Sequence, residues 1–264
     1  MRRLPWGGPK GGAAGVAVAN RRQVYGLHAV RALLARRPKA IVVAKLLDET
    51  SGRLAELVDD LRQQGVPIER VRRAELDRFC GGATHQGVLI EVEAAAEFTL
   101  GDFEALVLER GRALRLLILD GVEDPRNLGA CLRTADAAGV DAVVVPKAHS
   151  APLTAVALKA ATGAAETVPV LRAPNLARTL RWLKQAGVWV VGADAQTERS
   201  LYATSLSSPV AIVLGGEGRG LRHLTRELCD ELVAIPMVGA VASLNVSVAA
   251  GVVLFELLRQ ARSE

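Results

Sequence analysis

Residues 114–145 read LRLLILDGVEDPRNLGACLRTADAAGVDAVVV, and this stretch decides the fold class. An aliphatic run at 116–119 is followed by a polar loop, a helix predicted over 127–138, the helix stop Gly139 and a second aliphatic run at 142–145. Apolar strands that alternate with helices are typical of a parallel sheet covered by helices on both faces. The stretch therefore predicts an α/β domain.

The same alternation continues to the end of the chain. The predicted strands are 168–171, 188–191, 210–214 and 232–235, and the predicted helices are 153–160, 176–185, 221–229 and 245–260. Ligands of open parallel sheets bind beyond the carboxyl ends of the strands. Three loops at such ends carry unusual residues, and they follow Leu119, Leu214 and Ile235.

A smaller α/β unit is predicted ahead of this domain, over residues 24–96. Its predicted helices are 28–37, 53–64 and 74–79, and its predicted strands are 40–44, 66–71 and 88–92. Residues 97–113 are interpreted as a linker and 114–264 as the second domain. Residues 1–23 are predicted to be a disordered, basic, Gly-rich tail, with an organellar address or an RNA-tethering arm as alternatives.

Composition excludes several classes of protein. Half of the 264 residues are hydrophobic and 3% are aromatic, which rules out disorder throughout and argues against an all-β sandwich. The net charge of +5 equals the charge of the acid-free tail, so the rest of the chain is neutral overall and the charge is only weak evidence for a basic nucleic-acid binder. Three widely spaced cysteines without a CxxC pair indicate a reducing cytosol and no structural metal.

The apolar runs are also too short for a membrane protein. None approaches the ~20 residues that a transmembrane helix needs. The run at 13–19 follows basic residues as in a secretion signal, but it is short and lacks leucine and phenylalanine. We therefore expect neither a transmembrane helix nor secretion.

The first loop, after Leu119, enters its helix through Pro125 and Asn127. Asparagine is a preferred helix cap, and Arg133 follows six residues later among small side chains. A single cation in such surroundings suggests a guanidinium that is aimed at a ligand. The alternative is that Asp124 or Asn127 only caps the helix and that Arg133 is a solvated charge on its surface.

The second loop belongs to VAIVLGGEGRGL, residues 210–221, where an apolar strand runs into four glycines with Glu217 and Arg219 between them. Glycine permits positive φ and close approach of the backbone, so the loop is expected to cradle a ligand. Its spacing matches neither a Rossmann fingerprint nor a Walker A loop. A glycine-rich connection needed only for helix–strand packing is the alternative.

The third loop lies between Pro236 and the last predicted helix. Its residues 239–242 are small and apolar, and Ser243 and Asn245 open a helix whose first turn offers free backbone N–H groups. Such a helix start can hold a polar ligand group. Ser243 is equally well explained as an ordinary capping residue.

Taken together, the three loops resemble the three signature motifs of the SpoU (TrmH) family of RNA 2′-O-ribose methyltransferases, in the same order along the chain. The matching residues are Asn127 and Arg133 for motif 1, Gly215 to Gly220 with Glu217 for motif 2, and Ser243-Leu244-Asn245 for motif 3. The segments that begin at Tyr25 and His85 resemble the family's ribosomal-protein-like RNA-binding domain. The resemblance covers residues 24–261, and it is greatest to members that act on a guanosine of bacterial 23S ribosomal RNA.

The resemblance implies a fold and a cofactor. The C-terminal domain is expected to be a trefoil-knotted parallel-sheet methyltransferase domain that binds S-adenosylmethionine and forms a homodimer. Gly215, Ile235 and Leu244 are expected to line the cofactor pocket. The apolar helix at 246–258 has hydrophobic residues on nearly all faces, which favours a dimer interface, although its own subunit could also bury it.

The resemblance also implies roles for four polar residues. Arg133 is expected to activate the ribose 2′-hydroxyl, and Asn127, Glu217 and Asn245 to position the RNA, the arginine or the cofactor. An arginine ordinarily has a pKa above about 12, so a basic role needs a strongly perturbed site. Stabilisation of a developing alkoxide or of a nearby phosphate is the alternative.

The implied activity is 2′-O-methylation of a guanosine in 23S ribosomal RNA or its large-subunit precursor, in the cytoplasm, without a metal or a membrane. A tRNA methyltransferase ordinarily lacks the N-terminal unit, and a non-catalytic RNA-binding assembly factor of the same fold has no need for intact catalytic residues, but both remain alternatives. The N-terminal unit is expected to supply RNA affinity. His28 and His85 are candidate RNA contacts, with a structural role favoured for His28.

Overall fold

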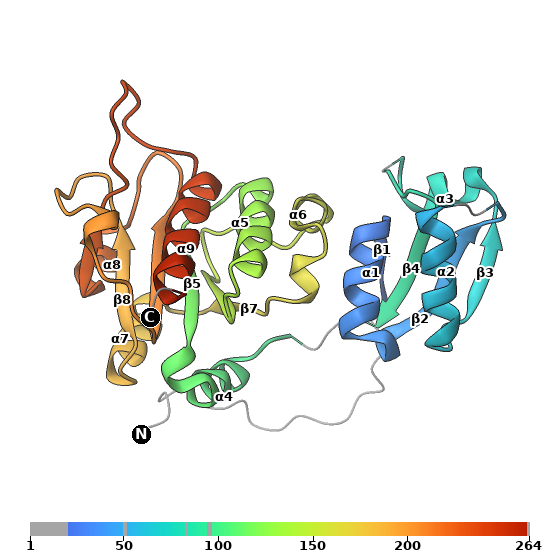
Figure 1. Cartoon of the computed structure of the whole chain (residues 1–264), viewed down its shortest axis with the longest axis horizontal. Helices are drawn as coiled ribbons and strands as arrows, with labels where there is room; N and C mark the ends of the chain where they lie inside the picture. Colours follow the sequence, from blue (N-terminus) through green and yellow to red (C-terminus); the bar gives the residue numbers. More distant parts are fainter. Residues whose placement is uncertain (1–20, 50–51, 83, 94–96, 263–264) are drawn as a thin grey trace. The chain divides into compact units, whose positions relative to one another are not determined.

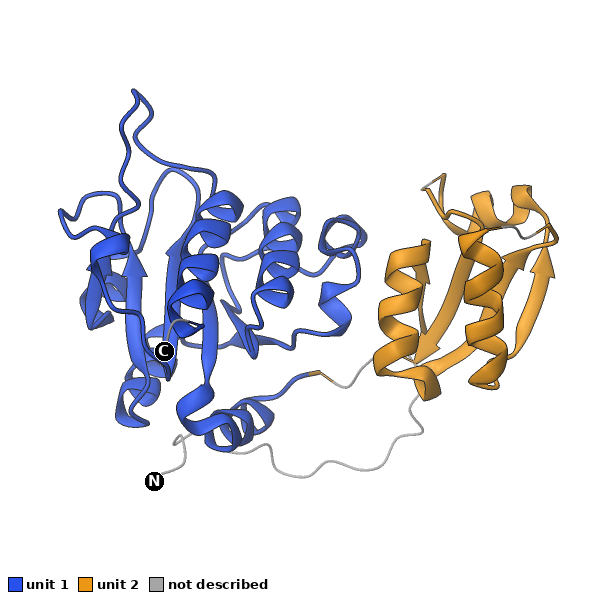
Figure 2. Ribbon diagram, viewed as in Figure 1, with its two compact units in different colours: residues 1–5, 98–264 blue, residues 6–97 orange. Residues whose placement is uncertain are grey.

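The computed structural model describes residues 21–49, 52–82, 84–93 and 97–262, which divide into two units (Figure 2). The smaller unit holds the described residues up to Glu97, and the larger unit holds those from Phe98 onward. Most of the predicted tail lies outside the described residues. The last three tail residues, 21–23, are not disordered, because they form part of a β-strand.

The smaller unit is a four-stranded mixed sheet with helices (Figure 1). Its elements are β1 (Arg21–Tyr25), α1 (Leu27–Arg36), β2 (Ile41–Leu47), α2 (Arg53–Gln63), β3 (Ile68–Val71), α3 (Arg73–Phe79) and β4 (Val88–Glu93). The strand order is β1-β4-β2-β3, with β2 and β3 parallel and the other pairs antiparallel. Helices α1 and α2 pack with Leu46 and Ile90, whereas α3 packs with Leu89 on the opposite face of the sheet.

Strand β1 was not among the predicted elements. Its sequence RRQVY contains one buried residue, Val24, and lacks the hydrophobic alternation of a strand. The strand forms because its backbone pairs with β4, from Arg21 opposite Glu93 to Tyr25 opposite Leu89. Pairing with a strand more than sixty residues away leaves no signal in the local sequence.

The larger unit is built on a six-stranded parallel sheet. Its elements are α4 (Leu100–Arg110), β5 (Arg115–Asp120), α5 (Pro125–Ala137), β6 (Ala142–Pro146), α6 (Ala155–Ala161), β7 (Val170–Ala173), α7 (Leu176–Gln185), β8 (Trp189–Ala193), β9 (Val210–Gly215), α8 (His223–Leu228), β10 (Glu231–Val233) and α9 (Val246–Ala261). The strand order is β10-β8-β9-β5-β6-β7, so β9 is inserted between β8 and β5. The α/β parallel-sheet fold is confirmed, and the trefoil knot stays a prediction.

Both faces of this sheet are buried. Leu117 and Leu119 of β5 belong to the core that α5 and α9 cover, while the alternate residues Leu116 and Ile118 are equally buried on the other face. Helices α5, α6 and α9 lie side by side (Figure 1). Burial on both faces explains why the strands are continuous apolar runs without alternation, as the sequence predicted.

The predicted linker at 97–113 contains a helix, α4, that the sequence did not predict. Thr99 caps this helix, and a reciprocal bond with Asp102 completes the cap. Phe103 is fully buried, and its ring lies 6.1 Å from that of Trp182 in α7. Helix α4 therefore belongs to the larger unit. Its pattern has little periodicity because only two of its residues, Phe103 and Val107, are buried.

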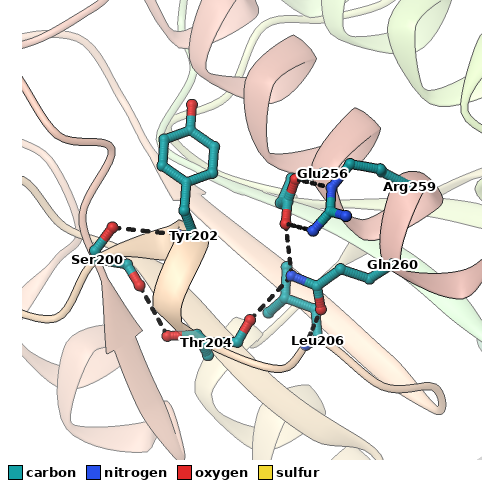
Figure 3. A network of polar contacts seen from close by, with 7 residues as sticks. All are labelled: Ser200, Tyr202, Thr204, Leu206, Glu256, Arg259 and Gln260. Atoms are coloured by element: carbon teal, nitrogen blue, oxygen red, sulfur yellow. Dashed lines mark hydrogen bonds and ion pairs between the residues drawn. The ribbon is translucent and has the colours of Figure 1, made fainter. Parts of the chain in front are cut away.

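A polar network fastens the end of α9 to the loop before β9 (Figure 3). The buried carboxylate of Glu256 accepts two hydrogen bonds from Arg259, both at 2.8 Å, and one from Gln260 at 2.7 Å. Gln260 also donates to the carbonyl of Thr204 at 3.0 Å and accepts from the backbone N–H of Leu206 at 2.6 Å. The hydrogen bond from Arg259, opposed by desolvation and helped by Gln260, lowers the pKa of Glu256 to about 2.

None of the helices in the described part of the chain is long and apolar enough to cross a membrane.

Candidate active site

Two of the three predicted loops, those after Leu214 and Ile235, line a cavity of about 460 Å³ at the carboxyl edge of the sheet, together with the loop after β8. Its lining comes from the ends of β8, β9 and β10 and from the start of α9. The lining residues are Ala193–Gln196, Leu214–Leu221, Arg226, Val233, Ile235, Met237, Ala242–Leu244, Val246 and Ala249. The predicted cofactor residues Gly215, Ile235 and Leu244 all line it, as do Glu217 and Ser243.

The glycine loop after β9 folds back tightly on itself. A Cβ atom on Gly215 would lie 2.0 Å from the carbonyl carbon of Gly220, and one on Gly216 would lie 2.1 Å from the carbonyl oxygen of Gly121. Gly218 has φ of 74°, a backbone conformation that side chains disfavour. The glycines are therefore required by close backbone approach and by positive φ, as the sequence predicted.

Three of the four predicted polar residues form one chain of hydrogen bonds. The Nδ2 group of Asn245 donates to Oδ1 of Asn127 at 3.1 Å, and Nδ2 of Asn127 donates to the Glu217 carboxylate. Asn245 caps α9, Asn127 lies in the first turn of α5, and Glu217 lies in the glycine loop. The three motifs are thus joined to one another by their side chains.

The direction of this chain is set by the backbone. The N–H of Ser247 donates to Oδ1 of Asn245 at 2.9 Å, so the amide oxygen of Asn245 is an acceptor and its nitrogen must donate. The same argument applied to Asn127 leaves an N–H group that points at Glu217. The chain therefore ends on an acceptor, and the carboxylate form of Glu217 completes it.

Arg133 is not part of this cluster. It is exposed on α5 and lines neither this cavity nor the second one described below. Six residues at 100° each place it about 120° around the helix from Asn127. Within the described residues of a single chain, the structure brings together Asn127, Glu217 and Asn245 but leaves Arg133 apart.

A second cavity of about 500 Å³ adjoins the first one over the ends of β5 and β6. Asp120 lines it, fully buried, and accepts a hydrogen bond from the backbone N–H of Arg222 at 3.1 Å. The other lining residues are Gly121, Glu123, His149, Gly216, Glu217, Arg219, Gly220 and Arg222. The glycine loop is therefore a common wall of the two cavities.

The cysteines in the described chain are poor nucleophiles. Burial, with a smaller contribution from Glu217, raises the pKa of Cys131 to about 12. Burial likewise raises the pKa of Cys229 to about 12, and it also raises the pKa of Cys80. Because the thiolate is the reactive form, covalent cysteine chemistry is not what this site offers. Among the described residues there is also no group of three or more potential metal ligands.

Sequence reasoning missed an ion pair on the wall of the first cavity. Asp194, directly after β8, forms an ion pair with Arg226 in which Oδ2 lies 2.8 Å from Nε, and Arg226 also donates a hydrogen bond of 3.5 Å to the Gln196 side chain. The signal that could have found Asp194 is its position after a parallel strand, which is the rule that selected the other loops. The strand before Asp194 was predicted, but its following loop carries no glycines and drew no notice.

In the smaller unit, one candidate RNA contact is wrong. His85 is 4% exposed, its Nε2 lies 3.0 Å from an oxygen of Asp77, and its Nδ1 accepts the backbone N–H of Gly87 at 3.0 Å. Both ring nitrogens are engaged within the unit, so His85 holds its loop and is closed to RNA. His28 is exposed in the first turn of α1.

Comparison with known proteins matches both units. Residues 115–255 match the model of the SpoU rRNA Methylase family, and residues 23–98 match the model "RNA 2'-O ribose methyltransferase substrate binding". The chain is 49% identical over 238 residues to the 23S rRNA (guanosine-2'-O-)-methyltransferase RlmB of Vibrio vulnificus, covering 90% of this chain and 96% of that protein. It is 51% identical over 239 residues to the protein of the same name from Pasteurella multocida, covering 90% and 97%.

A solved structure shares the fold over nearly the whole chain. The SpoU methyltransferase AviRb from Streptomyces viridochromogenes, solved in complex with the cofactor AdoMet, superposes with a TM-score of 0.75 at 23% identity. The match covers 93% of this chain and 92% of that chain. At this identity the likeness concerns the fold alone.

Proposed function

The chain belongs to the SpoU rRNA methylase family, and from this premise we propose that it transfers the methyl group of S-adenosylmethionine to the 2′-hydroxyl of a guanosine in 23S ribosomal RNA. The observation that carries the proposal is the hydrogen-bonded chain Asn245–Asn127–Glu217, whose last member lines a ligand-sized cavity. Relatives of about half identical sequence carry the name of this activity.

The first cavity fits such a cofactor. A volume of about 460 Å³ lies within the usual range for small-molecule sites, roughly 300–1,000 Å³. Leu214, Ile235 and Leu244 supply apolar wall, and the glycine loop supplies bare backbone that would hold the adenosine by main-chain bonds. Among its charged lining residues, Asp194 is paired with Arg226 at 2.8 Å, and Glu217 contributes a further carboxylate. When bound, the cofactor supplies an electrophilic methyl group.

Residues of the chain would bind and orient the ribose 2′-hydroxyl that accepts the methyl group. A ribose hydroxyl is a poor nucleophile until its proton is being removed. Glu217, which accepts a hydrogen bond from Asn127 and lines the first cavity, would also accept one from a ribose hydroxyl. Because Arg133 lies apart from this cluster within one chain, it would stabilise the developing alkoxide or a flanking phosphate from the second copy of a homodimer.

The smaller unit would supply affinity for RNA. Its match to a substrate-binding model and its separate core support this division of labour. Removal of residues 1–95 leaves α4 and the larger unit intact, and it is expected to weaken RNA binding while preserving cofactor binding. Unchanged RNA binding by the shortened chain would contradict this assignment. The substrate class also implies that the protein acts in the cytoplasm.

A homodimer is proposed through the helical layer of α5 and α9. On α9, the side chains of Val248 and Phe255 are 51% and 49% exposed, although this helix is among the most apolar of the unit. A second copy would cover them. Light scattering of the purified chain measures the mass directly, and Phe255→Glu is expected to shift a dimer toward the monomer.

The decisive experiment is transfer of labelled methyl from S-adenosylmethionine to purified 23S, 16S and transfer RNA, followed by alkaline hydrolysis. Label in an alkali-resistant dinucleotide that begins with Gm, from 23S RNA alone, is the expected result. Label in transfer RNA instead would identify the tRNA enzyme. Arg133→Ala is expected to abolish transfer and to leave cofactor binding nearly unchanged, and normal transfer by this variant would remove its proposed role.

A further inference from the structure

The second cavity lies beside the first at the carboxyl edge of the sheet. Gly216, Glu217, Arg219 and Gly220 line both cavities. On the proposed function, a methyl acceptor that contacts Glu217 reacts next to this shared wall. The base of a nucleotide is attached to the ribose carbon beside the one that bears the 2′-hydroxyl, so the base of the reacting nucleotide lies within one sugar ring of the shared wall. The second cavity is adjacent to it.

One guanidinium in this cavity, that of Arg222, lies against a buried carboxylate. Asp120 is fully buried at the end of β5, and its Oδ1 atom lies 3.4 Å from Nε of Arg222 but accepts no hydrogen bond. Its Oδ2 atom accepts the backbone N–H of the same residue at 3.1 Å. The Nε edge of the Arg222 guanidinium thus faces the buried carboxylate of Asp120, and the opposite charges attract each other.

The rest of the guanidinium is available for a ligand. The Arg222 side chain is 46% exposed, and within the described part of the chain its two Nη groups donate no hydrogen bond. It lies against Gly121, where a Cβ atom would be 3.4 Å from Nη2, and the φ of 87° at Gly121 also favours glycine. The absence of a side chain there leaves room for the planar group.

We propose that the second cavity receives the base of the target nucleotide and that Arg222, positioned by Asp120, reads the O6 and N7 atoms of guanine. This inference rests on the proposed function. A guanidinium that donates two parallel bonds to O6 and N7 is the commonest protein contact to guanine. Adenine carries an amino group in place of O6. This group and the guanidinium of Arg222 are both hydrogen-bond donors, so they cannot bond to each other. A cavity of about 500 Å³ holds one base that has been turned out of its stack.

The test uses full-length chain and 23S RNA in which the methylated guanosine, once located, is replaced by 7-deazaguanosine through ligation of a synthetic segment. This analogue keeps O6 and base pairing but lacks N7. The unmodified chain is expected to methylate guanosine about tenfold faster, by kcat/KM, than 7-deazaguanosine. Arg222→Lys keeps a positive charge beside Asp120 but loses the planar fork, and it is expected to methylate both RNAs at one reduced rate.

Two further variants complete the test. Asp120→Asn keeps the shape of the acid but removes its charge, and it is expected to reduce the ratio between the two RNAs without changing the Kd for S-adenosylhomocysteine. Arg181→Ala removes an exposed arginine of α7 that lines neither cavity, and it is expected to keep the full ratio.

Equal rates on both RNAs with the unmodified chain, or an unchanged ratio in Arg222→Lys, would overturn the inference. An equal loss on both RNAs that deepens with salt would assign Arg222 to a phosphate. Absence of transfer to the guanosine RNA by the unmodified chain would instead remove the proposed function, so the two failures are distinct.

Discussion

Asn245 donates its side-chain N–H to the side-chain carbonyl of Asn127 at 3.1 Å, across 118 residues of sequence. This bond joins the start of α9 to the first turn of α5. It also fixes the amide of Asn127 so that its own N–H group points at Glu217. At the carboxyl edge of the sheet, these three side chains therefore form a relay of hydrogen bonds, and the backbone N–H of Ser247 in α9 sets its direction.

Breaking the relay at its centre is expected to slow methyl transfer. Asn127→Asp replaces the donor by a carboxylate of the same shape and sets two negative charges against each other. Loss of a hydrogen bond to a charged group predicts at least a tenfold fall in kcat, with cofactor Kd nearly unchanged. Because two adjacent carboxylates can share a proton, activity should recover in part as pH falls. Transfer assays with labelled cofactor measure both effects.

The matched control is Asn175→Asp. Asn175 caps α7 by accepting the N–H of Arg178 at 3.0 Å, and aspartate caps a helix equally well. Its activity should equal that of the unmodified chain. A pH-independent loss in Asn127→Asp, or full activity at neutral pH, would contradict the relay.

The glycine loop is expected to tolerate no side chain at Gly215. A Cβ atom there would meet the backbone of Gly220 at 2.0 Å, so Gly215→Ala must displace the loop that forms the common wall. We expect at least a tenfold weaker Kd for S-adenosylhomocysteine, measured by calorimetry, because the wall of the cofactor cavity moves. Gly101→Ala in α4, where the nearest atom is at an ordinary 3.7 Å, is the control and should bind normally.

Glu256 predicts a pH-dependent contribution to stability. Its pKa is lowered from 4.5 to about 2 in the folded chain, chiefly by the hydrogen bond from Arg259. A group with a depressed folded pKa stabilises the protein above its unfolded pKa and loses that contribution as pH falls. Glu256→Gln should therefore lower stability by about 1 kcal/mol at pH 7, allowing for the exposed guanidinium.

The difference in unfolding free energy between the unmodified chain and Glu256→Gln should shrink as pH falls from 4.5 toward 2. Urea unfolding at a series of pH values follows this difference, with tryptophan fluorescence, to which the buried Trp182 contributes, as the signal. A difference that stays constant over this window would mean that the network in Figure 3 is not stabilised by charge.

The cysteines are expected to be inert in the folded chain. Burial raises the pKa of both Cys131 and Cys229 to about 12, so almost no thiolate is present at pH 8. Iodoacetamide at that pH should leave the native protein unmodified at these positions and fully active. Mass spectrometry after treatment, compared with the denatured chain, gives the extent of modification. Rapid labelling of Cys131 in the native protein would show that α5 opens readily.

The two histidines of the smaller unit are expected to behave differently. His85→Ala removes a buried ring with two partners, which predicts a loss of a few kcal/mol from that unit, seen as faster hydrogen exchange in β4. His28→Ala should leave exchange unchanged, because its side chain is exposed. Equal protection in both variants would contradict the structural role of His85.

Much of the fold followed from local patterns. Burial of both faces makes β5, β6 and β9 continuous apolar runs, and turn glycines such as Gly139 mark the ends of helices, so these elements lay close to their predicted ranges. Strand β1 and helix α4 were missed for a common reason. Each is stabilised by a partner distant in sequence, β4 for the strand and Trp182 for the helix, and each buries few of its own residues.

The sequence by itself determined which residues could form the site, because unusual polar and glycine residues followed apolar strands at three points. Only the tertiary structure decided how they meet. It joined Asn127, Glu217 and Asn245, set Arg133 apart from them, and opened a second cavity around Asp120 and Arg222.

The physical reason is the distance along the sequence between the residues that interact. Strand and helix patterns reflect the burial of neighbouring residues and are written locally, whereas a hydrogen bond across 118 residues or a glycine loop shared by two cavities depends on the order in which strands lie side by side. That order is a property of packing and not of any one segment.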